Sequence, residues 1–382
     1  MPPDSPAVPR ILDLAALLAG KSHFLFGPRL TGKSYLLRHT LPKARTYDLL
    51  DNTVYLDLSA RPSRIEEELG AHDKLVVIDE IQRLPLLLNE VHRLIEKRNI
   101  RFLLTGSSAR KLRRGGVNLL GGRARVKHLR PLCFRELGSH FELPRAMRHG
   151  LLPAIYFSDD PKADLAAYAG AYLQQEIVAE GVTRNVPAFS RFLAVAAQCN
   201  ATIVNFTNVA SDAQVPRTTV YEYFDILRDT LLLEEVPAWR ASKSRKPLVS
   251  SKYYFFDVGV VGHLQGRAYR TGTQEFGQAL ETYIAHELFC FRDYVSGDPV
   301  QHWRSASGFE VDFLLGTHTA IEVKAKAPVG TRDLRSLLAL KEERQFKRLL
   351  CVSLESRARR VEGIDILPLK TFLKALWDEE YR

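Results

Sequence analysis

Short apolar runs separated by polar turns dominate the first third of the chain. Residues 24–26, 75–78 and 100–104 are apolar except for Arg101, as expected of strands that a parallel sheet buries on both faces. Residues 11–20 have apolar positions at helical spacing and predict an amphipathic helix packed on the same domain. The pattern therefore predicts an N-terminal α/β domain built on a parallel sheet.

A different pattern follows residues 144–150, where proline and glycine interrupt the apolar periodicity. Residues 165–177 have aromatic and aliphatic side chains at helical spacing and predict a linker helix. Residues 206–210 and 216–227 predict two helices joined by a polar turn, and residues 231–236 predict a strand. Helix, turn, helix and strand is the order of a winged helix, whose second helix often enters the DNA major groove.

The C-terminal third alternates between helical and strand patterns. Residues 277–289 predict an amphipathic helix, residues 310–315 and 320–324 predict a hairpin, and residues 331–340 predict another helix. We expect an α/β chain with an N-terminal parallel-sheet domain, a central helical and winged-helix region, and a C-terminal α/β domain. The expected boundaries are 1–148, 149–245 and 246–382.

Residues 27–34 form a G-x-x-x-x-G-K-S phosphate-binding loop, or P-loop, after an apolar strand and before a helix. Its glycines let backbone N–H groups surround a polyphosphate at a helix N-terminus. Lys33 is expected to reach the β- and γ-phosphates of ATP, and Ser34 to ligate Mg²⁺. A chance turn of this sequence is the alternative, and the flanking strand and helix argue against it. The expected nucleotide-binding residues of the loop are Gly27, Pro28, Arg29, Leu30, Thr31, Gly32, Lys33 and Ser34.

Two carboxylates complete this prediction. Asp79 and Glu80 end the apolar run 75–78 and should face the ligand crevice at the carboxyl ends of the strands. Asp79 suits Mg²⁺, and Glu80 suits polarisation of the attacking water, so the pair predicts hydrolysis as well as binding. Ser107, in the hydroxyl cluster 105–108 after the next strand, is expected to sense the γ-phosphate or to orient water. The alternative role of that cluster is helix N-capping, which is compatible with the first.

The predicted C-terminal hairpin carries a second group of charged residues. Period-two alternation directs Glu322 and Lys324 to one face, and the hairpin can bring Asp312 beside them. Asp312 and Glu322 would hold Mg²⁺ or Mn²⁺, and Lys324 would stabilise charge at a scissile phosphate. Glu281 lies beside the apolar face of helix 277–289 and needs a partner, either a metal or Lys324. The alternatives are an ordinary surface hairpin or a nuclease fold that has lost catalysis.

Composition limits the partners. The formal net charge is +10 and the sequence pI is about 9.4, which favours polyanions and above all nucleic acid. Basic runs occur at 110–114 and 240–246, although each is also compatible with a solvated loop. Four scattered cysteines fit a reducing compartment rather than a disulfide framework or zinc site. With no segment as long as a membrane span, we expect a soluble, cytoplasmic protein.

The N-terminal motifs resemble those of a group of AAA-type P-loop ATPases from bacteria and archaea. The resemblance rests on Leu-Thr-Gly-Ser-Ser at 104–108, Gly-Arg at 122–123 and Pro-Leu-x-Phe-x-Glu at 131–136. It implies that an arginine near Arg123 acts as a finger or sensor, and a finger supplied to a neighbouring subunit implies a homo-oligomer. The competing candidates are Arg110, Arg113 and Arg125.

The C-terminal segment resembles the restriction-endonuclease-like core with its Asp…Glu-x-Lys signature, a PD-(D/E)xK nuclease. A nuclease-like domain also follows the ATPase in the group named above. The leading hypothesis is an ATP-dependent DNA-processing protein with a metal-dependent nuclease domain. The alternatives are an ATP-controlled switch acting through the winged helix and a nuclease-dead DNA clamp or motor. In the winged helix, residues 217–221 would lie near phosphates, or the region would serve as a packing lid or protomer contact.

Overall fold

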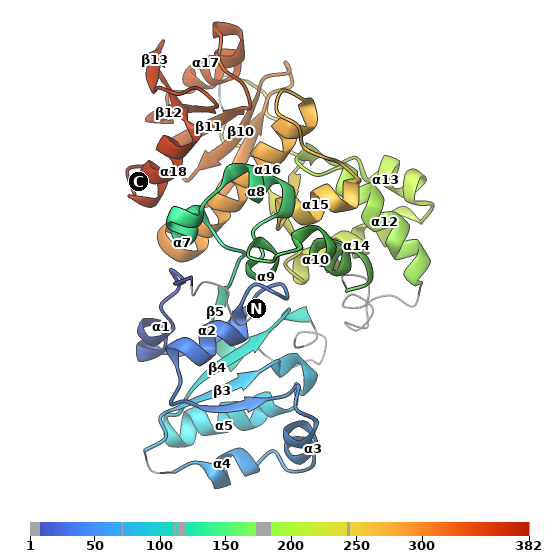
Figure 1. Cartoon of the computed structure of the whole chain (residues 1–382), viewed down its shortest axis with the longest axis vertical. Helices are drawn as coiled ribbons and strands as arrows, with labels where there is room; N and C mark the ends of the chain where they lie inside the picture. Colours follow the sequence, from blue (N-terminus) through green and yellow to red (C-terminus); the bar gives the residue numbers. More distant parts are fainter. Residues whose placement is uncertain are drawn as a thin grey trace. The chain divides into compact units, whose positions relative to one another are not determined.

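The computed structural model describes residues 8–70, 72–110, 112, 120–172, 185–242 and 245–381. They divide into two compact units (Figure 1). The first unit is mainly Pro9–Pro131, and the second is mainly Leu132–Asp225 and Leu233–Arg382. Among the described residues, none of the helices combines the length and the apolar character needed to cross a membrane.

The first unit contains the predicted parallel sheet. Its strands are β1 (Ser22–Phe26), β2 (Arg45–Asp48), β3 (Leu75–Asp79), β4 (Arg101–Gly106) and β5 (Ala124–His128). They are all parallel, in the order β2-β3-β4-β1-β5. The helices are α1 (Leu14–Gly20), α2 (Lys33–Thr40), α3 (Asn52–Ala60), α4 (Arg64–Glu68) and α5 (Leu87–Arg98). The parallel order brings the carboxyl ends of β1, β3 and β4 to one edge, where ligands bind in such sheets.

Alternate residues of these strands supply the core of the first unit. Phe24, Ile78 and Phe102 are fully buried and pack with Ile65 of α4 and Leu94 of α5. Burial of both faces explains why β1, β3 and β4 are nearly continuous apolar runs. Asp13 caps α1, because its carboxylate accepts a hydrogen bond from Ala16 N at 3.0 Å.

The central region has the predicted order of helix, turn, helix and strand. Its helices are α7 (Phe134–Leu137), α8 (Leu143–His149), α9 (Pro153–Tyr156), α10 (Pro161–Ala167), α12 (Val186–Gln198), α13 (Phe206–Ala213) and α14 (Arg217–Asp229). The strands β6 (Thr202–Ile203), β7 (Leu233–Val236) and β8 (Lys252–Phe255) form an antiparallel sheet in the order β6-β8-β7. Only residues 165–172 of the predicted linker helix are described; they are helical, and 173–177 lie outside the described residues.

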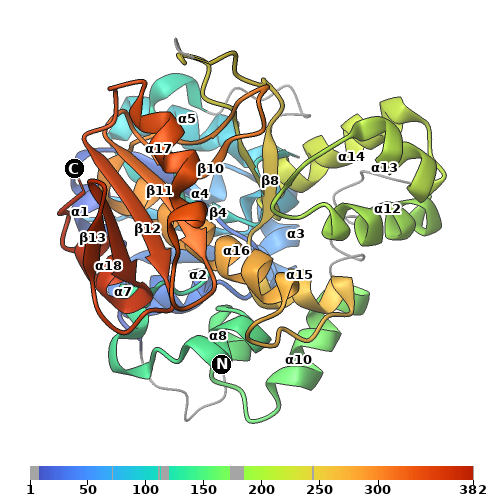
Figure 2. The same cartoon turned by 90° about the horizontal axis from the view of Figure 1, so that it is seen from above.

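The last third forms a mixed six-stranded sheet in the order β13-β14-β12-β11-β10-β9. Its strands are β9 (Val300–Arg304), β10 (Glu310–Leu315), β11 (Thr319–Lys324), β12 (Arg348–Ser353), β13 (Arg359–Val361) and β14 (Ile364–Pro368). The accompanying helices are α15 (Val258–Gln265), α16 (Gln274–Phe291), α17 (Arg335–Lys341) and α18 (Leu369–Trp377). Strands β10 and β11 are the predicted hairpin, and α16 and α17 contact it (Figure 2). This domain is α/β as predicted.

Candidate nucleotide-binding and acidic sites

The P-loop connects β1 to α2 at the carboxyl edge of the parallel sheet. Gly32 has φ 92° and Leu30 has φ 62°, so the loop turns back over the start of α2, which begins at Lys33. A Cβ atom at Gly27 would lie 2.3 Å from the carbonyl oxygen of Leu129, and glycine is therefore required there. The loop presents the N-terminus of α2 to this edge, the geometry that binds phosphate.

Lys33 is buried and its ammonium group contacts backbone carbonyls of the loop itself. Its Nζ donates to Gly27 O at 2.7 Å and to Pro28 O at 3.2 Å. The Thr31 hydroxyl donates to the same Pro28 oxygen at 2.8 Å. These acceptors are neutral, so they orient the lysine without cancelling its charge. The geometry suits a cation that is to meet a polyphosphate.

Arg10 braces the P-loop from outside the motif. Its guanidinium donates to Thr31 O and to Arg130 O, both at 2.6 Å. The loop is thereby connected to the segment that follows β5. Arg10 was not predicted from the sequence, because its acceptor Thr31 lies 21 residues further along and no periodic pattern connects the two positions.

Asp79 lies directly beside the P-loop serine, as the sequence analysis expected. The Ser34 hydroxyl donates to Asp79 Oδ2 at 2.8 Å, and the Thr105 hydroxyl donates to Asp79 Oδ1. Strand β4, which contains Thr105 near its carboxyl end, lies between β1 and β3 and so bridges the two motifs. A hydroxyl and a carboxylate are the hard oxygen ligands that Mg²⁺ prefers, and these two residues fit that ion.

Glu80 follows Asp79 in a left-handed conformation, with φ 61°, which few residues other than glycine adopt. Its carboxylate accepts a hydrogen bond from Gln82 Nε2, which also contacts Ser107 Oγ at 3.2 Å. Gln82 Oε1 is buried and has no hydrogen-bond partner. One polar group beside Asp79 is thus formed by Glu80, Gln82 and Ser107. Gln82 was not predicted from the sequence, because it belongs to no recognisable motif.

Arg123 lies away from the P-loop of its own chain. Strand β5 begins beside Ser22 and ends beside Phe26, and the P-loop follows Phe26. Arg123 precedes β5 and therefore lies at the amino ends of the strands, whereas the P-loop lies at their carboxyl ends. There Arg123 pairs with Glu96. The competing candidate Arg113 lies outside the described residues.

The exposed face of α14 carries charges of both signs. Arg217 donates to the hydroxyl of Tyr221 at 2.8 Å, and the Tyr221 ring stacks on Phe206 with ring centroids 4.4 Å apart. Glu222 and Asp225 are exposed on the same helix. This helix is therefore not a uniformly basic surface.

The C-terminal hairpin brings together the charged residues that its alternation predicted. Asp312 Oδ2 accepts a hydrogen bond from Val323 N at 2.8 Å, and Lys324 Nζ pairs with Glu322. A cavity of about 500 Å³ contains these three side chains and that of Glu310 among its lining. Hairpin register explains this grouping, because β10 and β11 pair antiparallel around Leu314 and Ala320.

Lys252 of β8 lies among the same carboxylates and was not predicted. Its Nζ is 3.1 Å from Glu281, 2.6 Å from Glu310 and 3.6 Å from Asp312. The side chain is only 2% exposed. Tyr254, two residues later on the same strand, donates its hydroxyl to Glu281 at 2.6 Å. The described partners of Glu281 are thus Lys252 and Tyr254, whereas the sequence analysis expected a metal or Lys324.

Burial and crowding of like charges perturb this cluster. Burial and the nearby Asp312 carboxylate raise the pKa of Glu281 to about 7. The same two causes raise the pKa of Glu322 well above its ordinary value. Burial lowers the pKa of Lys252, but the neighbouring acidic groups, Glu281 foremost, raise it well above its ordinary value. Lys252 is therefore a permanent internal cation.

The acidic cluster fits a divalent cation with two protein ligands. Glu322 Oε2 is buried and has no hydrogen-bond partner among the described residues, so it is one carboxylate oxygen beside Asp312 that could bind a cation. Within the described ranges, no group of three or more His, Cys, Asp or Glu side chains is arranged to hold a metal. Mg²⁺ commonly takes one or two carboxylates and completes its shell with water. Asp312 and Glu322 meet that smaller requirement.

Comparison with known families and proteins assigns the class of the N-terminal domain. Residues 19–138 match the family model described as an AAA domain. With its P-loop and parallel sheet, the first domain is an AAA-type P-loop ATPase domain. Residues 140–271 and 276–372 match two further models, each described as a domain of unknown function, DUF8612 and DUF4143. The nuclease-like resemblance of the last domain therefore remains a prediction.

Two curated mycobacterial proteins are similar along most of the chain. They are the uncharacterized proteins Rv2008c of Mycobacterium tuberculosis and Mb2031c of Mycobacterium bovis. Each is 27% identical over an alignment of 345 residues. The alignment covers 85% of this chain and 76% of the relative. Among solved structures, the Walker-type ATPase PABY2304 of Pyrococcus abyssi is 16% identical with a TM-score of 0.45, over 66% of this chain and 93% of that one. That likeness is too low to carry an argument.

Proposed function

We propose that this chain is an ATP-dependent DNA-processing protein that couples ATP hydrolysis in its N-terminal domain to metal-dependent DNA cleavage in its C-terminal domain. The observation that carries the first half is the contact of Ser34 with Asp79 at 2.8 Å, beside Lys33 and Glu80. These four residues supply phosphate binding, metal ligation and water activation at one edge of one sheet.

The roles in ATP hydrolysis follow from chemistry and position. Lys33 and the N-terminus of α2 bind the β- and γ-phosphates, and Ser34 and Asp79 would hold Mg²⁺, which offsets phosphate charge. Glu80 orients the attacking water. In the present geometry its carboxylate is held by Gln82, so hydrolysis requires Glu80 to exchange that contact for water. Ser107, which also contacts Gln82, can register this change.

The C-terminal half of the proposal rests on Asp312, Glu322 and Lys324. Asp312 and Glu322 would hold Mg²⁺ or Mn²⁺, whose chemistry is to polarise a phosphodiester and lower the pKa of bound water. Lys324 stabilises negative charge that develops on the phosphate. Glu281 positions Lys252 and Tyr254 beside Asp312 rather than touching the substrate.

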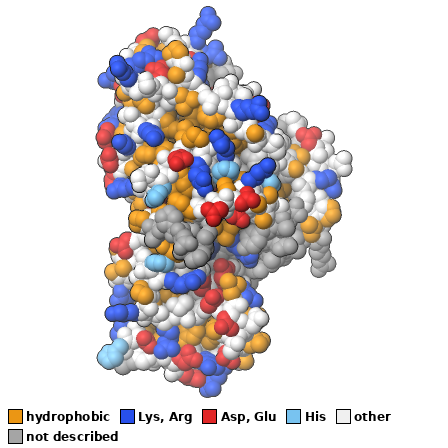
Figure 3. Space-filling model, in the orientation of Figure 1, with side chains coloured by type: hydrophobic (Ala, Val, Ile, Leu, Met, Phe, Trp, Pro, Cys, Tyr) orange, Lys and Arg blue, Asp and Glu red, His pale blue; other side chains and the backbone are white. Residues whose placement is uncertain are grey.

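DNA is the proposed polyanionic partner, since the chain carries a formal net charge of +10. Lysine and arginine side chains are spread over the visible face and mixed with acidic ones, so this face has no single basic stripe (Figure 3). Arg123 is at the sheet edge opposite its own P-loop, which favours a role as a finger for a neighbouring copy in a homo-oligomer.

One observation favours a second candidate, the nuclease-dead DNA clamp or ATP-controlled switch. Lys252 Nζ lies 3.6 Å from Asp312 Oδ1 and carries charge that would repel a metal ion there. If the lysine replaces the metal, the domain binds DNA without cutting it, and ATP occupancy controls that binding.

The test combines ATP hydrolysis and cleavage assays on single-stranded, duplex and four-way DNA with Mg²⁺ or Mn²⁺. Glu80→Gln should abolish DNA-stimulated ATP hydrolysis. Asp312→Asn should abolish cleavage, whereas Asp365→Asn, in a surface ion pair with Arg360, should not. DNA-stimulated hydrolysis without cleavage of any substrate would select the clamp. ATP hydrolysis indifferent to DNA, with no cleavage, would refute the DNA-processing proposal.

A further inference from the structure

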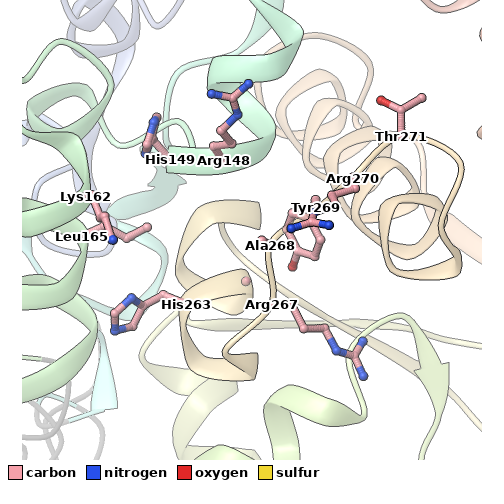
Figure 4. Close-up of a pocket in the computed structure, with 11 residues that line it drawn as sticks. Arg148, His149, Lys162, Leu165, His263, Arg267, Ala268, Tyr269, Arg270 and Thr271 are labelled. Atoms are coloured by element: carbon pink, nitrogen blue, oxygen red, sulfur yellow. The ribbon is translucent and has the colours of Figure 1, made fainter.

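A hollow in the second unit is lined largely by basic side chains, with no acidic ones among the described residues that line it. Its volume is about 600 Å³, and its lining includes Arg148, Lys162, Arg267 and Arg270 together with two histidines. Three elements contribute: Arg148 lies in the last turn of α8, Lys162 lies in the first turn of α10, and Arg270 follows α15 (Figure 4). All of them belong to residues 140–271, the segment that matches a domain of unknown function.

The four cations differ in their partners. Arg267 donates to the side-chain oxygens of Gln278 and Gln198, at 3.1 and 3.0 Å, and Glu275 is its acidic neighbour. Among the described residues, the side chains of Arg148, Lys162 and Arg270 take part in none of the ion pairs or hydrogen bonds that the structure records, and all three are exposed. A polyanion can therefore approach them without breaking existing contacts.

Three acidic groups close to the hollow in the chain are engaged in other contacts. Asp160 caps α10 by accepting a hydrogen bond from Ala163 N at 3.1 Å, and Asp164 accepts one from the hydroxyl of Ser158. Asp257 is buried and accepts a hydrogen bond from Leu151 N at 2.6 Å. None of these carboxylates lines the hollow. Basic side chains therefore outnumber carboxylates among the described residues that line the hollow.

The walls of the hollow are fixed by buried contacts. Asp257 joins the start of α15 to Leu151, just beyond α8. The Tyr269 ring packs on Gly262, where a Cβ atom would come within 2.8 Å of the ring. Arg145 ties α8 to the following segment by donating to Tyr156 O at 2.6 Å and Ser158 O at 3.0 Å. Such support holds in place the backbone segments that carry the charged side chains before a ligand arrives.

We infer that this hollow, with Arg148, Lys162 and Arg270 at its rim, binds the phosphate groups of a ligand. Guanidinium and ammonium groups placed around one hollow are suited to phosphate oxygens. Two sources share that chemistry, a nucleic-acid strand and a free nucleotide. The strand is the expected source, because the three rim cations are exposed and come from separate elements; this choice rests on the proposed function.

The test compares the wild-type chain with the variant Arg148→Ala/Lys162→Ala/Arg270→Ala. A matched control, Lys347→Ala/Arg357→Ala/Lys370→Ala, removes three exposed positive charges from elsewhere in the same unit. Binding of labelled single-stranded and duplex DNA is followed by fluorescence anisotropy over a salt series. The rim variant should bind about 30-fold more weakly, and the slope of log K against log salt should shrink by about 2–3.

A second arm measures inorganic pyrophosphate by calorimetry, with Lys33→Ala in every chain so that the P-loop does not contribute. Loss of pyrophosphate binding alone would identify a free nucleotide as the source. The charge-preserving variant Arg148→Lys/Lys162→Arg/Arg270→Lys should keep most of the affinity, which separates lost charge from lost folding. Equal behaviour of the rim variant and the control toward both probes would overturn the inference.

The outcomes separate this inference from the proposed function. If wild-type chain binds no DNA, the DNA-processing proposal fails, and the pyrophosphate arm still decides what the hollow binds. If wild-type chain binds DNA and the rim variant behaves like the control toward both DNA and pyrophosphate, only the role of the hollow is refuted.

Discussion

Two buried lysines, Lys33 in the first unit and Lys252 in the second, are held in opposite ways. Lys33 donates to two backbone carbonyls of the phosphate-binding loop, and these neutral acceptors do not cancel its charge. Lys252 lies within 3.6 Å of Glu281, Glu310 and Asp312, which offset its charge. A lysine with neutral partners is prepared for a substrate, whereas a lysine with ionic partners mainly serves the protein that surrounds it.

The largest expected effect is on ATP hydrolysis in Lys33→Ala. Loss of the cation that meets the developing phosphate charge should lower kcat/KM about 10³-fold, or about 4 kcal/mol. Stability should change little, because the carbonyl acceptors can bond to water. The measurements are steady-state phosphate release and thermal unfolding, with the exposed Lys97→Ala as control. Near-normal hydrolysis in Lys33→Ala would contradict the assignment of this site.

Lys252→Met should mainly lose stability, whereas Lys33→Ala should mainly lose ATP hydrolysis. Removing the cation leaves three carboxylates crowded without compensation, which should lower the free energy of unfolding by about 3 kcal/mol. All three tryptophans, Trp239, Trp303 and Trp377, are in the second unit. Their fluorescence during denaturation therefore reports this unit alone.

A second substitution checks the cause of that loss. Adding Glu281→Gln to Lys252→Met removes one of the uncompensated charges and should restore part of the stability. Lys347→Met, at an exposed position, is the control for loss of a lysine. An unchanged denaturation midpoint in Lys252→Met would mean that its ion pairs contribute nothing and that the comparison of the two lysines fails.

The two lysines also show what a sequence can and cannot reveal. The P-loop was predictable because its residues are contiguous and its geometry is local. Asp312, Glu322 and Lys324 were predictable because one hairpin sets their spacing. Lys252 was not, since it precedes Asp312 by 60 residues and only the tertiary packing of β8 brings it there.

The same distinction holds for the fold. The continuous apolar strands β1, β3 and β4 were predicted, whereas β2 and β5, with polar residues along their length, were not. The strands β9 and β12 to β14 were also missed, because their pairing depends on partners distant in the chain. Arg10 and Gln82, which support the P-loop site, likewise act across gaps that leave no periodic signal.

A buried carboxyl group should make the stability of the second unit depend on pH. Glu287 is buried and accepts hydrogen bonds from Phe134 N, the Tyr283 hydroxyl and Trp377 Nε1. Burial raises its pKa from an ordinary 4.5 to about 7. Its stabilising contribution is therefore fully present below pH 4.5 and is lost as the pH rises through about 7.

Between about pH 5 and about pH 8, this group should lower the free energy of unfolding of the wild-type unit by about 2 kcal/mol. Glu287→Gln does not titrate, so its slope over the same range should be smaller by that amount, whatever its absolute stability. Tryptophan fluorescence in denaturant at several pH values gives both slopes. Parallel slopes in the two chains would show that Glu287 does not titrate in this range.

The smallest expected effect tests whether the P-loop needs support from outside its motif. Arg10→Ala removes the donors to Thr31 O and Arg130 O and should loosen the loop around ATP. The expected result is a rise of about 5-fold in KM for ATP, or about 1 kcal/mol, with kcat nearly unchanged. The matched control is Arg101→Ala. Arg101 also donates to two carbonyls, Leu18 O and Ala19 O at 2.9 Å, but it begins β4 and so lies at the end of the sheet opposite the P-loop. An equal rise of KM in both variants would mean that Arg10 stabilises the domain generally. A rise of KM in Arg10→Ala alone would show that the P-loop, whose carbonyls contact Lys33, must be held in place by residues outside its motif.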